Sequence, residues 1–232
     1  MIAAVLGTGA ASFEVASIKP AVPDAGGSSG EDGRNGLLKV YNVSLRRCIR
    51  YAYGMPETQI LGGPKWVDDL RYDIRARADQ PVAEPELLKM LQPLLADRFK
   101  LTLHHETRLM AGYVLTVAKG GVKATVSGAT GGWGANGSRG RIDTAGAPMS
   151  ELTIRLTNLL ERPVVDGTQD ARRFDFHLRW SPDNAAVSPD PAASDGPSLA
   201  TALEEQLGLR LISQRVSAEV IVIDHAEFPS SD

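Results

Sequence analysis

The chain has 232 residues, of which 43% are hydrophobic, and a formal net charge of −3. This length can form one large domain or two small ones, and the nearly balanced charge gives no reason to expect a nucleic-acid partner. The single cysteine, Cys48, excludes an intramolecular disulfide. No apolar run approaches the roughly 20 residues that cross a bilayer, so we expect no transmembrane segment.

The first twelve residues, MIAAVLGTGAAS, are small, apolar and uncharged. They resemble the end of a signal peptide with a small-residue cleavage site near Ala10–Ser12, although the basic segment that normally comes first is missing. The alternative is an ordinary disordered N-terminus. The signal-peptide interpretation predicts a periplasmic or secreted protein.

Short elements with clear periodicity follow. Phe13–Ile18 and Leu37–Tyr41 read as strands on either side of a Gly- and Ser-rich loop. A helix comes next, capped by Asn42 or Ser44, with an apolar stripe formed by Leu45, Cys48, Ile49, Ala52 and Tyr53. The stripe predicts that Cys48 is a small buried side chain. Tyr72–Ala78 alternates apolar and charged residues, as a half-exposed strand does.

The segment 84–117 contains a helix followed by strands. Leucines recur with helical spacing at positions 87, 88, 91, 94 and 95. Pro93 leaves the carbonyl four residues earlier without a partner, which predicts a kink. Phe99–His104 and Tyr113–Val117 alternate as strands do, and we expect a bend at Thr107–Arg108 to join them into a hairpin.

The second half repeats these blocks in the same order. The offsets between matching blocks lie between 102 and 112 positions. The helix stripe recurs 107 positions on, with Leu152, Leu156, Leu159 and Leu160 in place of Leu45, Ile49, Ala52 and Tyr53. The strand Tyr72–Ile74 recurs at Phe174–Phe176 (102), the helix from Pro85 recurs from Pro197 (112), and Phe99–Leu101 recurs at Leu209–Leu211 (110). Loop insertions produce such drift. The order favours an internal duplication, although common α+β patterns could also match by chance.

The predicted fold is therefore α+β, with two duplicated β-α-β-α-β-β units. Each unit should have an antiparallel-rich sheet with helices on one face. The expected divisions are 1–12 as signal remnant or disordered N-terminus, 13–120 as the first unit, 121–140 as a glycine-rich connection, and 141–232 as the second unit. The glycines around 120–146 also allow a long hairpin instead of a flexible connection.

Nine blocks occur together and in order: FEVASIKP (13–20), AYG (52–54), LGGPKWV (61–67), YDIRA (72–76), LLADRFKLTLHHETR (94–108), PVVDGT (163–168), FDFHLRW (174–180), EQLGLRL (205–211) and VIDHAEFP (222–229). This pattern resembles a large paralogous family of exported proteins of unknown function that is expanded in soil Acidobacteria. The resemblance implies an exported protein with no assigned catalytic residues. Some members resemble sensor portions of larger membrane proteins, which implies a binding or signalling module. Pro93 departs from the helix former expected there.

His104-His105-Glu106 is the densest polar cluster. On a strand, His104 and Glu106 share one face and His105 lies on the other. A metal would need a third ligand such as Asp224 or His225, and the sequence has no H-E-x-x-H or CxxC motif. The alternative is that these are partly exposed residues forming cross-strand pairs.

Two further sets of residues suggest sites. Asp183, Asp190 and Asp195 lie on a Pro- and Ala-rich loop and could hold calcium, although their spacing fits no EF-hand and a solvated loop is the alternative. Tyr53, Trp66 and Trp133 could line an apolar pocket together with His104 and Glu106, or the aromatic residues could simply belong to the core.

The leading hypothesis is an exported, non-catalytic module that binds a small ligand, an envelope component or a protein. It needs no cofactor. The alternative is a hydrolase of small esters or lactones, with His104 and Glu106 as catalytic residues and calcium as a cofactor. A third interpretation is an oligomerisation domain that uses exposed sheet edges; the sequence does not define the oligomeric state.

Overall fold

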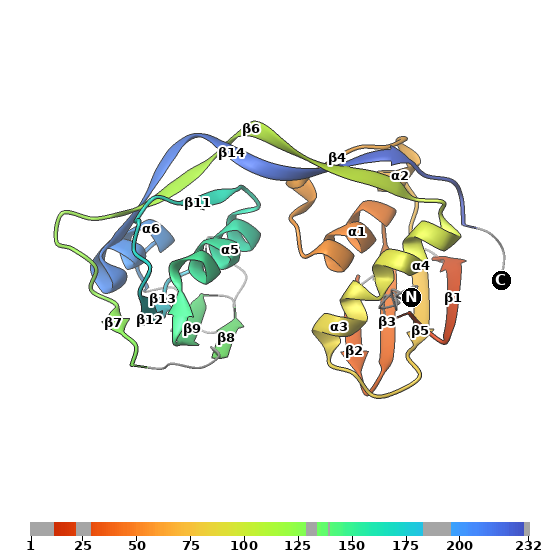
Figure 1. Ribbon diagram of the computed structural model, residues 1–232, viewed down its shortest axis with the longest axis horizontal. Coiled ribbons are helices and arrows are strands. Elements are labelled where there is room, and N and C mark those ends of the chain that lie inside the picture. Colours follow the sequence, from red (N-terminus) through yellow and green to blue (C-terminus); the bar gives the residue numbers. More distant parts are fainter. Residues whose placement is uncertain (1–11, 22–28, 129–133, 139, 183–195, 230–232) are drawn as a thin grey trace, which may run out of the picture. The chain divides into compact units, whose positions relative to one another are not determined.

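A computed structural model describes residues 12–21, 29–128, 134–138, 140–182 and 196–229 (Figure 1). Its helices and antiparallel-rich sheets confirm the predicted α+β class. The chain divides into two compact units. Unit 1 comprises Met1–Thr107 and Glu219–Asp232, and unit 2 comprises Arg108–Ala218.

These divisions differ from the ones expected at 120 and 141. They fall inside two long strands, β6 (Thr102–Val117) and β14 (Leu209–His225). The bend and hairpin predicted at Thr107–Arg108 are wrong, because β6 continues through these residues beside β14. Neither residue provides the turn chemistry of glycine, proline or asparagine, so the pairing with β14 keeps the backbone extended.

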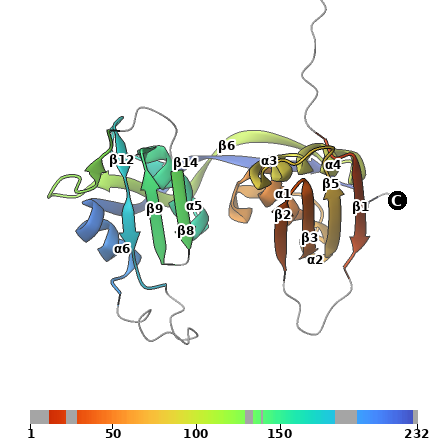
Figure 2. The ribbon, with the colours of Figure 1, turned by 90° about the horizontal axis from the view of Figure 1, so that it is seen from below.

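Unit 1 contains a four-stranded antiparallel sheet in the order β1-β5-β3-β2 (Figure 2). The strands are β1 (Val15–Pro20), β5 (Tyr72–Arg77), β3 (Leu37–Val43) and β2 (Gly30–Arg34). Alternate residues such as Val40 and its partner Ile74 are buried, as the two-residue period of a strand requires. Helices α1 (Leu45–Tyr53), α3 (Glu84–Lys89) and α4 (Leu91–Arg98) complete this core.

The local sequence sets the bounds of these helices. Ser44 caps α1 by accepting from the Arg47 N–H at 3.2 Å, and Gly54 ends the helix in the left-handed conformation. Burial raises the pKa of the Cys48 thiol to about 12, consistent with the predicted small core side chain. The kink expected from Pro93 is confirmed as a break at Met90, between α3 and α4.

Three short elements lie between α1 and β5 in the chain. They are η1 (Glu57–Gln59), β4 (Ile60–Gly62) and α2 (Trp66–Asp69).

Unit 2 has two three-stranded antiparallel sheets. One has the order β13-β9-β8, with strands His177–Arg179, Arg141–Ala145 and Gly134–Ser138. The other has the order β10-β12-β7, with strands Ala147–Pro148, Arg173–Asp175 and Thr125–Val126. The glycine-rich segment therefore forms a β8–β9 hairpin, which was the second of the two alternatives.

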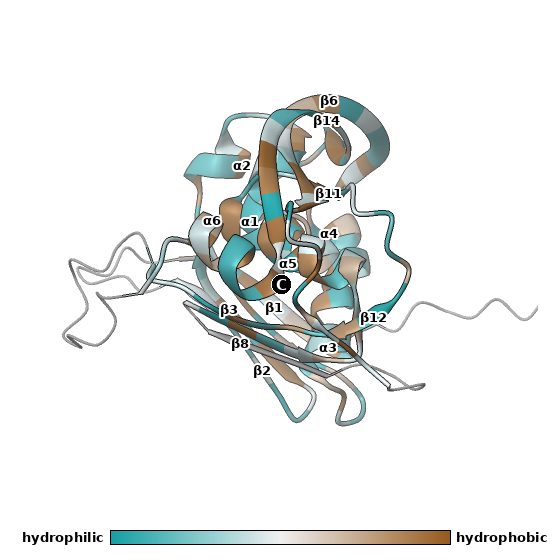
Figure 3. Cartoon of the chain, turned by 90° about the vertical axis from the view of Figure 1, so that its left-hand side faces the viewer, coloured by the Kyte–Doolittle hydropathy of each residue, from teal (hydrophilic) through white to brown (hydrophobic). Residues whose placement is uncertain are grey.

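Two helical segments of unit 2 cover its core. They are α5 (Met149–Leu160) and α6 (Leu199–Ala202), which continues into the π-helical turn η4 (Leu203–Leu207). Figure 3 shows how the hydropathy of β6 and β14 changes repeatedly along each strand, as expected for strands with mixed exposure. The part of the chain that the structure describes contains no helix long and apolar enough to cross a membrane.

The long strands share a sheet in the order β11-β6-β14-β4. β11 (Val164–Asp166) pairs in parallel with residues 113–115 of β6, all in unit 2. β4 pairs in parallel with residues 221–223 of β14, all in unit 1. Each unit therefore contains the C-terminal part of a strand that begins in the other unit.

One backbone feature occurs in both units. Asn42 (φ 52°) donates its N–H to Asp73 Oδ1 at 2.8 Å, and Gly146 (φ 68°) donates its N–H to Asp175 Oδ1 at 2.7 Å. Asn42 lies at the irregularity near the end of β3, and Gly146 directly follows β9. In each case the aspartate accepts from a backbone donor that the strand ladder leaves free.

The buried positions of α1 and α5 match at a different offset from the one that the leucine pattern predicted. The inward positions of α1 are Leu45, Cys48, Ile49 and Ala52, and those of α5 include Met149, Leu152, Thr153 and Leu156. The offset is 104 positions (Leu45 to Met149), not 107, because Leu159 is exposed whereas Met149 and Thr153 are buried. The duplication itself stays a prediction.

Gly208 provides a test of the packing in unit 2. It ends η4 with φ 66°, and a Cβ there would overlap the carbonyl oxygen of Gly121. Gly121 has φ 78° with open space around it. We expect Gly208→Ala to lower the free energy of unfolding by more than about 3 kcal/mol, and Gly121→Ala by roughly 1–2 kcal/mol, the left-handed penalty alone. Urea denaturation followed by circular dichroism measures both, and equal losses would contradict the packing.

Candidate functional site

The histidine cluster predicted on β6 lies in unit 1, where it pairs with β14. His104 Nδ1 lies 2.9 Å from both carboxylate oxygens of Asp224, and His104 Nε2 lies 3.8 Å from Glu106 Oε2. His104 and Glu106 share a face, as residues two apart on a strand should. The imidazole therefore lies between two carboxylates.

These carboxylates change the acid–base behaviour of His104. The hydrogen bond with Asp224 is the largest cause that raises the pKa of His104, and the charge of Glu106 acts in the same direction. The side chain is half exposed, so water screens the pair and its contribution to stability is small. A carboxylate hydrogen-bonded to Nδ1 also fixes the orientation of the imidazole ring and stabilises its protonated form.

His105 lies on the opposite face of β6 with different partners. Its Nδ1 is 2.5 Å from Glu219 Oε1, and its ring is 6.1 Å from the Tyr53 ring on α1. Gln59 holds the same glutamate by donating from Nε2 to the Glu219 carbonyl at 2.7 Å. The two histidines thus form cross-strand pairs, the second of the alternatives drawn from the sequence.

The aromatic residues predicted to line a pocket take other positions. Tyr53 contacts His105, not His104. Trp66 packs on Phe99 at 6.5 Å and on Phe228 at 4.8 Å between ring centroids, which joins the start of α2 to the core. Trp133 lies outside the described residues.

The expected metal ligands are not assembled in the region that the structure covers. Among the described residues, no group of three or more His, Cys, Asp or Glu side chains is placed to hold a metal ion. Asp224 is paired with His104, while His225 Nε2 lies 3.0 Å from Glu227. The calcium candidates Asp183, Asp190 and Asp195 lie outside the described residues.

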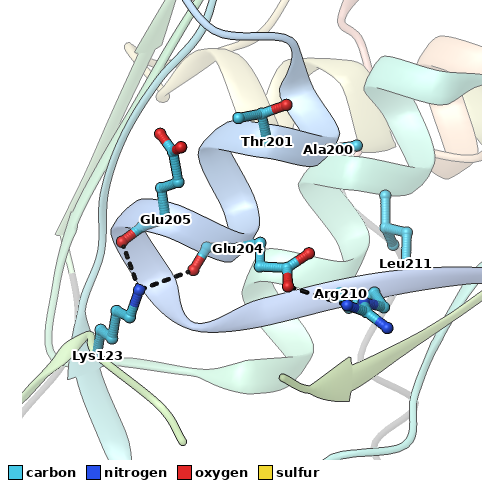
Figure 4. Close-up of a pocket in the computed structure, with 7 residues that line it drawn as sticks. All are labelled: Lys123, Ala200, Thr201, Glu204, Glu205, Arg210 and Leu211. Atoms are coloured by element: carbon cyan, nitrogen blue, oxygen red, sulfur yellow. Dashed lines mark hydrogen bonds and ion pairs between the residues drawn. The ribbon is translucent and has the colours of Figure 1, made fainter. Parts of the chain in front are cut away.

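A polar pocket in unit 2 is the site that sequence reasoning missed (Figure 4). It has a volume of about 580 Å³ and lies between α6–η4 and the start of β14. Its lining combines two cations, two acids, a hydroxyl and two apolar side chains: Lys123, Arg210, Glu204, Glu205, Thr201, Ala200 and Leu211. The only sequence signal nearby was the EQLGLRL block, because Lys123 reaches the pocket from a distant loop.

Lys123 is fixed at the end of the helical segment. Its backbone N–H donates to the Leu207 carbonyl at 2.9 Å, and its Nζ donates to the carbonyls of Glu204 and Glu205 at 3.2 and 3.1 Å. A cation is favourable there, because the last carbonyls of a helix lack intrahelical partners. An ammonium has three donors, so one stays available to a ligand.

The other charged side chains of the pocket remain accessible. Arg210 Nη2 donates to Glu204 Oε1 at 2.9 Å, and these side chains are 51% and 46% exposed. The guanidinium has five N–H donors, so this contact leaves several free. The Glu205 side chain extends away from Lys123 (Figure 4). The pocket therefore offers both cationic donors and a carboxylate acceptor.

Comparison with protein-family models matches residues 46–226 to a protein of unknown function (DUF3738). The chain belongs to the DUF3738 family. Neither the curated proteins nor the solved structures give a match. The membership agrees with the unknown-function family expected from the nine blocks, and it assigns no chemistry to either the histidine cluster or the pocket.

The His104–Asp224 pair gives a pH prediction for this family member. Because the folded-state pKa of His104 is raised, its small stabilising effect is full below the unfolded pKa of about 6.5 and is lost as pH rises through the folded pKa. In Asp224→Asn the pKa of His104 should fall, because the variant lacks the carboxylate that is the largest cause of the raised value. NMR titration of the imidazole protons of His104 measures this change, and an unchanged His104 pKa would contradict the pairing.

Proposed function

We propose that this DUF3738 protein is a non-catalytic binding module whose unit 2 pocket takes a small dipolar ligand, one with an anionic and a cationic group. The observation that carries the proposal is the pocket between α6–η4 and β14, with its balanced pairs of charges. The exported location expected from the N-terminal composition would place this ligand outside the cytoplasm.

The anionic group of the ligand would bind Lys123 and Arg210. Lys123 has one free donor beyond its two carbonyl contacts, and Arg210 has further N–H groups beyond its contact with Glu204. Hydrogen bonds between charged partners are the stronger kind, and a carboxylate can accept from both side chains. The half-exposed Arg210–Glu204 pair can shift toward a ligand at little cost.

The cationic group of the ligand would bind Glu205. Its side chain lines the pocket without approaching Lys123 (Figure 4). Ala200 and Leu211 add apolar contact to the lining. The volume of about 580 Å³ is within the range of small-molecule sites. A free amino acid or a short peptide with both termini uncapped has this chemistry.

The pocket that carries the proposal does not include the residues of the hydrolase alternative. That alternative would use His104 and Glu106 of β6 in unit 1, where His104 pairs with Asp224. His104 and Glu106 also lie outside the lining of the unit 2 pocket. The proposal therefore assigns these side chains to cross-strand pairing and not to chemistry.

The test is an NMR titration of the full chain with alanyl-alanine, alongside the same dipeptide capped as an N-acetyl amide. We expect the uncapped dipeptide to perturb the amides of Lys123, Thr201 and Glu205, and the capped form to bind much more weakly. Arg210→Ala should lower the affinity at least about tenfold, since a charged hydrogen bond contributes roughly 1.5–3 kcal/mol.

Arg215→Ala is the matched control, because Arg215 lies on the same strand and outside the pocket lining. It should leave the affinity unchanged. Equal binding of the capped and uncapped dipeptides, or equal losses in the two arginine variants, would contradict a dipolar-ligand pocket.

A further inference from the structure

Within the described part of the chain, one side of β14 has no strand partner over most of its length. In the sheet β11-β6-β14-β4, β14 lies between β6 and β4, but β4 pairs only with residues 221–223. Among the residues that the structure describes, no strand pairs with the far side of 209–220. Alternate N–H and C=O groups along this edge are therefore directed away from β6, as at any sheet edge.

This edge is accessible within unit 2. Positions 212–215 are exposed, and the apolar side chain of Ile212 is 44% exposed. Arg210 and Leu211 are successive strand residues whose side chains point to opposite faces, and both line the unit 2 pocket. We infer that the open edge continues from that pocket along β14.

The edge lacks two of the devices that block strand addition in other proteins. Its sequence over 209–218, LRLISQRVSA, has no proline and no lysine. Residues 209–218 run as one strand within β14, a stretch of ten residues. Its length and regular extension make it a template for another extended chain.

The charge of the edge has one sign. Arg210 and Arg215 are the only charged residues in 209–218. Arg210 is partly neutralised by Glu204. Arg215 donates to the main-chain carbonyl of Leu109 at 3.0 Å, and this neutral acceptor does not balance its positive charge. An incoming strand with acidic side chains would complement this surface.

We propose that the open edge of β14 in unit 2 is a docking site for an extended, acidic segment of a partner protein, which binds by strand addition. Main-chain hydrogen bonds along 211–215 supply the affinity. Arg215 pairs with an acidic side chain of the incoming segment, and Ile212 contacts an apolar one. This interaction begins beside the pocket, whose lining includes Leu211, and it does not require a ligand in the pocket.

The test uses the full chain and capped, fluorescein-labelled hexapeptides at low ionic strength, where charge effects are least screened. One peptide alternates valine with glutamate, a second alternates valine with lysine, and a third is the glutamate peptide with alternate amides N-methylated. Fluorescence anisotropy gives the affinities, and amide NMR shifts locate the site. We expect only the glutamate peptide to bind measurably, with perturbations concentrated at 211–215.

Charge-reversal variants form the matched pair. Arg215→Glu should weaken the glutamate peptide at least about tenfold and improve the lysine peptide. Lys119→Glu makes the same charge change at an exposed position of unit 2 off the edge and should have no effect. The amide spectrum of each variant reports whether the fold is intact.

Four results would overturn the proposal: no binding of the glutamate peptide, equal binding of its N-methylated form, equal losses in the two variants, or perturbations away from 211–215. A concentration-dependent dimer that Arg215→Glu dissociates would also overturn it, because a second copy of the chain would then occupy the edge.

Discussion

The pairing of β6 with β14 is the constraint on which the structure depends. Each strand begins after a helix of one unit and ends in the other, where it pairs with a three-residue strand. The chain that follows each strand then closes a helix end. Glu227 donates its N–H to the Phe99 carbonyl at 2.7 Å in unit 1, and Lys123 donates to the Leu207 carbonyl at 2.9 Å in unit 2. Each incoming strand therefore supplies both core side chains and a cap.

This exchange explains where the candidate sites occur. The pocket forms where η4 ends and β14 begins, and the loop that delivers Lys123 to it follows the end of β6. The open edge exists because β4 meets only the last part of β14. In unit 1 the same pairing brings His104 to Asp224 and His105 to Glu219. The binding surfaces and the histidine pairs thus arise from one topological feature.

Much of the local structure could be predicted from sequence because it depends on neighbouring residues. The α1 stripe, its Ser44 cap and the break near Pro93 follow from helical period, capping and the missing proline donor. The bend at Thr107–Arg108 was wrong because strand pairing with β14, a contact between distant segments, determines the backbone there. The pocket was missed for the same reason, since Lys123 and Glu204 are 81 positions apart. The His104–Asp224 contact was foreseen only as one option for a third ligand, because residue types do not define strand register.

The most direct test of the strand exchange is hydrogen exchange on a chain truncated after Ala218. This removes Ile221 and Ile223, both buried in the unit 1 core, together with the cap on Phe99. Unit 2 is continuous in sequence and retains its part of both strands. We predict that amides of α1, α4 and β5 lose protection while those of α5, β9 and β12 keep it. Native protection in unit 1 after truncation, or loss of protection in unit 2, would contradict the account.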